Sequence, residues 1–226
     1  MKKEYLFLFL SALFFGSIHP IGKLLMTEIT PLQFTLIRTS FAFLILSIGL
    51  LFSGEWKIIR KMKRDDVYIC IILGIISFFL FQVLLSLALT KIPAAINSVL
   101  INSTIPISVL ALTGIISHKK ITKYSVFGVI LGMLGMSLVV LKPEDLSLIN
   151  MVGVAFALIA GLFWGINTFL ITRVRKKYGT LPVLSISILS GAIVSFVFTL
   201  LLDGCSQLAN ASFNTKLLFL SYSLCC

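Results

Sequence analysis

The chain has 226 residues, of which 58% are hydrophobic and only 12% are charged, so it has too little polar surface to coat a water-soluble globule. This composition excludes an ordinary soluble protein and predicts a membrane protein that crosses the bilayer several times. The net charge of +11 would suit a nucleic-acid-binding protein. However, the basic residues lie in short blocks between apolar runs, as membrane topology requires, and we therefore expect no nucleic-acid partner.

Long apolar runs follow one another along the chain, and a helix needs about 20 such residues to cross a bilayer. The sequence therefore predicts an all-α polytopic membrane protein with seven full transmembrane helices and a partial eighth. The eighth begins near Thr215 and ends at Cys226 after about half a span, so we expect a C-terminally truncated chain. The predicted complete spans are Tyr5 to Leu25, Leu32 to Leu51, Val67 to Leu89, Ala94 to Ile116, Tyr124 to Leu141, Ile149 to Thr172 and Leu181 to Leu202.

Two of these helices have starts that the sequence marks chemically. Thr30 followed by Pro31 predicts an N-cap and a first-turn proline for the second helix. Asp65 and Asp66 place acid at the positive end of the third helix.

The distribution of basic residues predicts the orientation in the membrane. Fourteen of the 19 lysines and arginines fall at the N-terminus and in every second loop, around residues 57–64, 119–123 and 173–177. Because basic loops stay on the cytoplasmic side, we expect a multi-pass protein of the cell (plasma or inner) membrane with a cytoplasmic N-terminus.

A short motif occurs twice in the chain, as A-L-F-F-G at Ala12 to Gly16 and as G-L-F-W-G at Gly161 to Gly165. Two small residues four positions apart give each helix a smooth face for a neighbouring helix. Five helices separate the two copies, so the second copy enters the membrane from the opposite side. The sequence therefore predicts an inverted repeat, with a first unit at residues 1–143 and an incomplete second unit at residues 149–226.

Further segments carry a resemblance to a known family. They are T-P-L-Q-F-T-L-I-R at Thr30 to Arg38, A-L-T-K-I-P-A-A-I-N at Ala88 to Asn97, Pro106 in mid-helix, and G-V-I-L-G-M-L-G at Gly128 to Gly135. With the duplicated motif, these segments resemble the EamA-domain transporters of the drug/metabolite transporter superfamily. The resemblance implies a ten-helix carrier built from two inverted five-helix repeats, which exports small metabolites such as amino acids or drugs by alternating access. It implies no enzyme activity and no cofactor.

Two ionisable residues inside the spans are candidates for function. Arg38 lies within the second helix, where it either extends toward the outer interface or provides a counter-charge for an anionic substrate. His19 precedes the helix-bending Pro20, and its imidazole either is hydrogen-bonded in helix packing or carries a coupling proton.

Amide side chains and a tryptophan complete the predicted substrate site. Gln82, Ser86 and Thr90 recur every four residues and predict a polar stripe on one helix face. Amides inside a membrane more often face partners or a wet cavity than lipid, whereas a tryptophan can simply mark the membrane interface. We expect substrate contacts from Gln82, Asn97, Asn102, Trp164 and Asn167 together with Arg38.

Two sets of residues have a structural interpretation. Gly128, Gly132 and Gly135 form a close-packing face on the fifth helix and offer a contact for a homodimer. The four cysteines show no metal-ligand spacing, so we expect no metal site.

Two other interpretations compete with transport. One is a non-functional truncated fragment of a transporter, whose polar helix faces would lack partners. The other is a membrane-embedded enzyme, but the spans carry no H-E-x-x-H motif, paired aspartates or G-x-S-G motif. We therefore expect a transporter of a small-molecule solute in a lipid bilayer.

Overall fold

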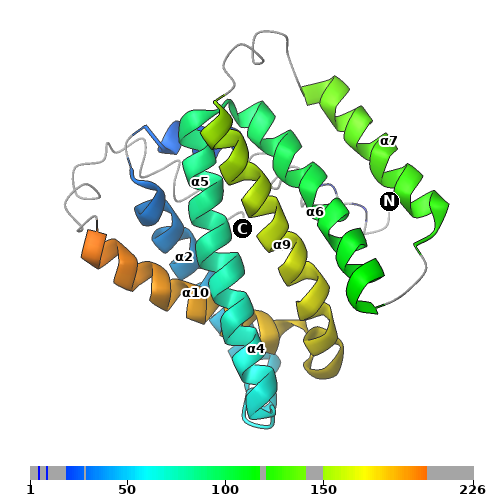
Figure 1. Cartoon of the computed structure of the whole chain (residues 1–226). Coiled ribbons are helices and arrows are strands. Elements are labelled where there is room, and N and C mark those ends of the chain that lie inside the picture. Colours follow the sequence, from blue (N-terminus) through cyan, green and yellow to red (C-terminus); the bar gives the residue numbers. More distant parts are fainter. Residues whose placement is uncertain are drawn as a thin grey trace.

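The computed structural model of the chain describes residues 19–27, 29–117, 121–140 and 150–202, together with Tyr5 and Phe9. Every regular element in these ranges is a helix, and Figure 1 shows the long helices assembled into one bundle. Several predicted features lie outside the described residues: the first copy of the duplicated motif, most of the first span, the eighth span and Cys205, Cys225 and Cys226. The elements are α2 (Pro31–Ser53), α3 (Trp56–Ile59), α4 (Arg64–Gly74), the π-helix η1 (Ile75–Leu80), α5 (Phe81–Lys91), α6 (Ala94–Ser117), α7 (Lys123–Val140), α9 (Met151–Tyr178) and α10 (Thr180–Leu202).

Five helices in the described ranges are long and apolar enough to cross a membrane, namely α2, the continuous α4–η1–α5 helix, α6, α9 and α10. They coincide with five of the predicted spans, to within a few residues at each end. The predicted fifth span corresponds to α7, of which Lys123–Gly135 is a shorter apolar helix. The total of seven complete spans and the inverted repeat stay predictions.

The helix starts have the chemistry that the sequence predicts. The Thr30 side chain accepts a hydrogen bond from the backbone N–H of Gln33, and Pro31 opens α2. The Gln33 side chain in turn accepts from the N–H of Thr30, which completes a capping box. Asp65 and Asp66 lie in the first turn of α4. Both predicted starts are confirmed.

Helix α9 lies between α5 and α6, and α10 packs along α2 and α4 (Figure 1). The glycines of the G-L-F-W-G motif allow α6 to approach α9 closely. A Cβ added at Gly161 would lie 2.6 Å from the Cβ of Thr104, and one added at Gly165 would lie 2.4 Å from the Cβ of Ser108. The predicted smooth helix face is therefore confirmed for this copy of the motif.

The long helix that follows the α3 turn changes its winding in the middle, because η1 is a π-helix between α4 and α5. The α10 helix is fastened to α4 just before this change. Its Ser187 and Ser190 hydroxyls donate hydrogen bonds of 3.0 and 3.1 Å to the carbonyl oxygens of Cys70 and Ile71. The half of the helix after η1 packs against α2 and, more extensively than α4 does, against α9. The π-helix therefore separates two parts of one helix that have different neighbours.

Candidate functional site

Arg38 points from α2 toward α5 inside the bundle. Its Nη1 donates a 2.8 Å hydrogen bond to Oε1 of Gln82, and the arginine is only half-buried. A hydrogen bond to a guanidinium is charge-assisted and stronger than one between neutral groups. The structure therefore holds the positive charge beside an amide that is itself 3% exposed.

His19 lies in the helical residues 19–25 and contacts the start of α6. The Asn97 amide nitrogen is 3.4 Å from Nδ1 of His19 and 3.5 Å from the carbonyl oxygen of Leu85. An amide nitrogen can only donate, so this arrangement requires an unprotonated Nδ1. The Oδ1 atom of Asn97 is buried and has no hydrogen-bond partner among the described residues.

These groups border a small cavity of about 50 Å³ in the middle of the bundle. Its polar lining comes from His19, Arg38, Gln82, Asn102 and Trp164, which belong to five different helical segments. The apolar part of the lining consists of Phe81, Leu85, Ile101 and Ile105. Five of the seven residues predicted for the substrate and proton sites therefore meet at one place, although they are far apart in sequence.

Trp164 forms an aromatic wall of this cavity. Its ring packs against Phe81 with the ring centroids 4.7 Å apart, and against Phe78 in an edge-on contact at 6.4 Å. The tryptophan therefore packs inside the bundle. Because Trp164 precedes Gly165, the close approach of α9 to α6 at this glycine also fixes the position of the aromatic wall.

The remaining predicted residues lie next to the cavity or away from it. Asn97 contacts His19 but is not among the lining residues, and Asn167 is buried on α9 with no partner for its Oδ1 in the described part of the chain. The predicted polar stripe on α5 turns inward over Gln82 and Ser86, whereas Thr90 is exposed at the helix end.

Lys23 is not among the residues predicted for the site, yet it joins two helices at one end of the bundle. Its Nζ donates to the carbonyl oxygen of Leu89 and, at 3.1 Å, to that of Ile92. These carbonyls lie at the C-terminal end of α5, where a cation is favourable to the helix dipole. The signal that could have revealed this contact is the pair Ile92-Pro93, since a proline after a helix leaves its last carbonyls without backbone donors.

A second contact joins helices at the other end of the long α4–η1–α5 helix. Lys177 and Tyr178, at the end of α9, donate hydrogen bonds of 2.5 and 2.7 Å to Oδ2 of Asp66 in the first turn of α4. The Lys63 backbone N–H donates to the same tyrosine hydroxyl at 3.3 Å. The cavity therefore lies between two sets of polar contacts, that of Lys23 near one end of the bundle and that of Asp66 near the other.

These features define a multi-helix membrane protein with a polar cavity where several helices meet, an arrangement in which membrane carriers bind their solutes. Comparison with known proteins agrees with this class. Residues 2–141 match the EamA-like transporter family, and the chain belongs to that family.

Three relatives are similar over most of this chain, and each is named only as an uncharacterized transporter. The protein of Archaeoglobus fulgidus is 25% identical over 87% of this chain and 67% of its own length. That of Clostridium kluyveri is 24% identical over 97% of this chain and 72% of its own length. The Bacillus subtilis protein YdfC is 28% identical over 78% of this chain and 56% of its own length.

Proposed function

We propose that the chain transports, and in the cell exports, a small metabolite that carries a carboxylate, such as an amino acid. The observation that carries this proposal is the cavity to which five helical segments contribute polar side chains. Ionisable and amide groups are costly inside a membrane unless they are paired or serve a solute pathway. The family assignment favours transport over catalysis for such a cavity.

The lining of the cavity favours a solute with an anionic end. Arg38 supplies a positive charge, and none of the lining residues in the described part of the chain is acidic. A guanidinium matches the planar geometry of a carboxylate, while Gln82 and Asn102 present amides to its polar groups. Trp164 and Phe81 offer an apolar surface to the rest of the molecule. An amino acid with an apolar side chain has all of these features.

The size of the cavity supports a cycle of opening and closing. A volume of about 50 Å³ has room for a few water molecules, whereas sites for drug-sized ligands span roughly 300–1,000 Å³. Solute binding therefore needs a wider form of the same cavity. Alternating access between inverted repeats, residues 1–143 and 149–226, provides such a form. In support, α2 packs along α10, and each is the second helix of its proposed repeat.

His19 is the candidate for proton coupling in this cycle. Protonation turns Nδ1 into a donor, which cannot face the Asn97 amide nitrogen. If the amide rotates, its buried Oδ1 becomes the acceptor for the new N–H. The two protonation states of His19 thus require two arrangements of His19 and Asn97, and Asn97 belongs to α6.

Uptake into proteoliposomes tests the proposed function. We expect a wild-type protein to accumulate at least one radiolabelled amino acid or small carboxylate, and not the matching alkylamine. Arg38→Gln should lower this uptake by about tenfold or more, since a hydrogen bond to a charged group contributes about 1.5–3 kcal/mol. Arg173→Gln, at an exposed position on α9, is the matched control and should remain within about twofold of wild type. Equal uptake by both variants would refute the assignment of Arg38.

A further inference from the structure

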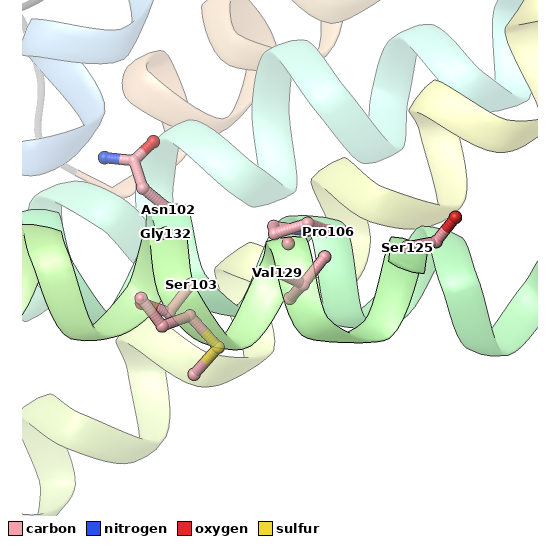
Figure 2. A pocket seen from close by; sticks show the side chains of 8 residues that line it. Asn102, Ser103, Pro106, Ser125, Val129 and Gly132 are labelled. Atoms are coloured by element: carbon pink, nitrogen blue, oxygen red, sulfur yellow. The ribbon is translucent and has the colours of Figure 1, made fainter. Parts of the chain in front are cut away.

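A second and larger cavity lies between α6 and α7, next to the site described above. It is a groove of about 400 Å³ in which both helices contribute to the lining (Figure 2). From α6 come Asn102, Ser103 and Pro106, and from α7 come Ser125, Gly128, Val129, Gly132 and Met133.

The α6 side of the groove is polar, and two of its groups lack a helix hydrogen-bond donor. Ser103 is 8% exposed, and its Oγ has no hydrogen-bond partner among the described residues. Pro106 lacks an N–H, so it cannot supply the usual helix hydrogen bond to the carbonyl oxygen of Asn102 four residues earlier. Ser103 and Asn102 both line the groove, and each brings to it an acceptor that lacks a helix donor, the hydroxyl of Ser103 and the carbonyl of Asn102.

The α7 side is apolar and belongs to a helix that faces the bilayer. Val129 and Met133 provide its side chains, and Gly128 and Gly132 keep it wide, since a Cβ added at either glycine would meet nothing within 4 Å. The opposite surface of α7 is exposed and apolar, with Tyr124, Phe127, Leu131, Leu134 and Leu138. In a membrane that surface meets lipid, so molecules dissolved in the bilayer have access to the edge of the groove.

Asn102 connects this groove with the central cavity, because it lines both of them. Its Nδ2 donates a 2.9 Å hydrogen bond to the carbonyl oxygen of Ser98, which ties the side chain to its own helix. Rotation of this one amide is thus the smallest movement that would alter the boundary between the two spaces.

We propose that the α6–α7 groove is a second binding site, for a small amphipathic molecule that enters from the bilayer with an apolar body and a neutral hydroxyl or N–H group. The apolar body lies along Val129 and Met133, and the polar group donates to Ser103 Oγ. The groove is then a lateral vestibule of the transport site. This role rests on the proposed transport function, whereas the binding of an amphipathic molecule in the groove does not depend on it.

Photolabelling tests the groove directly. The probe is an eight-carbon alcohol bearing a diazirine, applied to the purified full chain in lipid nanodiscs, with adducts mapped by mass spectrometry. We expect adducts on the peptides that contain Ser103, Val129 and Met133. Gly132→Leu should reduce these adducts at least fivefold because its side chain fills the groove. Gly135→Leu is the matched control, because this glycine is equally open but does not line the groove, and its labelling should equal that of wild type.

The polar contact is tested with the same probe. Ser103→Ala should lower labelling by the alcohol at least threefold and leave labelling by the corresponding diazirine alkane unchanged. If the alkane labels the groove as strongly as the alcohol, the space holds lipid chains only, and the proposal is wrong. Unchanged labelling in Gly132→Leu would overturn it as well. Neither result depends on solute uptake, so the transport proposal can fail or stand separately.

Discussion

The closest helix contact around the cavity predicts a specific defect. In Gly165→Ala, the new Cβ would lie 2.4 Å from the Cβ of Ser108, about 1 Å short of ordinary van der Waals contact. The obstacle is a Cβ attached to the α6 backbone, not the end of a flexible side chain, so α9 and α6 must separate. Such overpacking costs about 1–3 kcal/mol, which corresponds to a melting temperature roughly 2 to 12 °C lower for a chain of this size. Because Trp164 precedes Gly165, the same shift moves the wall of the cavity.

Thermal unfolding of the purified protein, followed by tryptophan fluorescence, measures this effect. Gly128→Ala is the matched control, since its Cβ would meet nothing within 4 Å, and we expect no loss of stability there. Ser108→Gly removes the opposing atom. The double variant Gly165→Ala/Ser108→Gly should therefore lose about 1 kcal/mol less unfolding free energy than the two single variants lose in total. If Gly165→Ala melts at the same temperature as Gly128→Ala, the inferred packing of α9 on α6 is wrong.

Three further outcomes are expected. His19→Gln replaces the imidazole by an amide, which does not titrate, so the uptake rate of this variant should be independent of pH between about 5 and 8. A wild-type pH profile in this variant would contradict proton coupling through His19. Lys23→Met keeps the aliphatic stem but loses the donors to the end of α5, so the melting temperature should fall by an amount equivalent to about 0.3–1 kcal/mol. Lys61→Met, at an exposed turn position, is the control and should have little effect. Lys177→Met breaks an exposed ion pair, so it should change the melting temperature little at low salt and not at all in 1 M NaCl; a large change at high salt would contradict this.

Local chemistry explains why much of the fold follows from the sequence. Hydropathy places α2, α6 and α10 within a few residues, because each is a predominantly apolar run of bilayer length. Thr30 and Pro31 mark the start of α2, because cap and first-turn preferences depend only on neighbouring residues. The π-helix could not be predicted in this way. The hydroxyls that bond to α4 just before it come from α10, 117 and 119 residues further along the chain.

The candidate site shows the same division. Arg38 and Gln82 stand out in the sequence, since polar residues within apolar runs are unusual, but their 2.8 Å hydrogen bond depends on how α2 packs against α5. Lys23 did not stand out, because a lysine close to a helix end is ordinary near a membrane interface. Its partners are backbone carbonyls 66 and 69 residues away, and backbone acceptors have no sequence signature. Composition identifies candidate groups, and helix packing decides which of them meet.

The π-helix at Ile75–Leu80 also separates the length of this long helix from the direction of its side chains. A π-helix bonds each N–H to the carbonyl five residues earlier, and not four as in an α-helix, so it accommodates one extra residue in about the same rotation. The loss of one residue within η1 would therefore restore ordinary winding and leave Gln82 facing Arg38. A relative could thus have one residue fewer in this helix and still place the same amide beside the arginine.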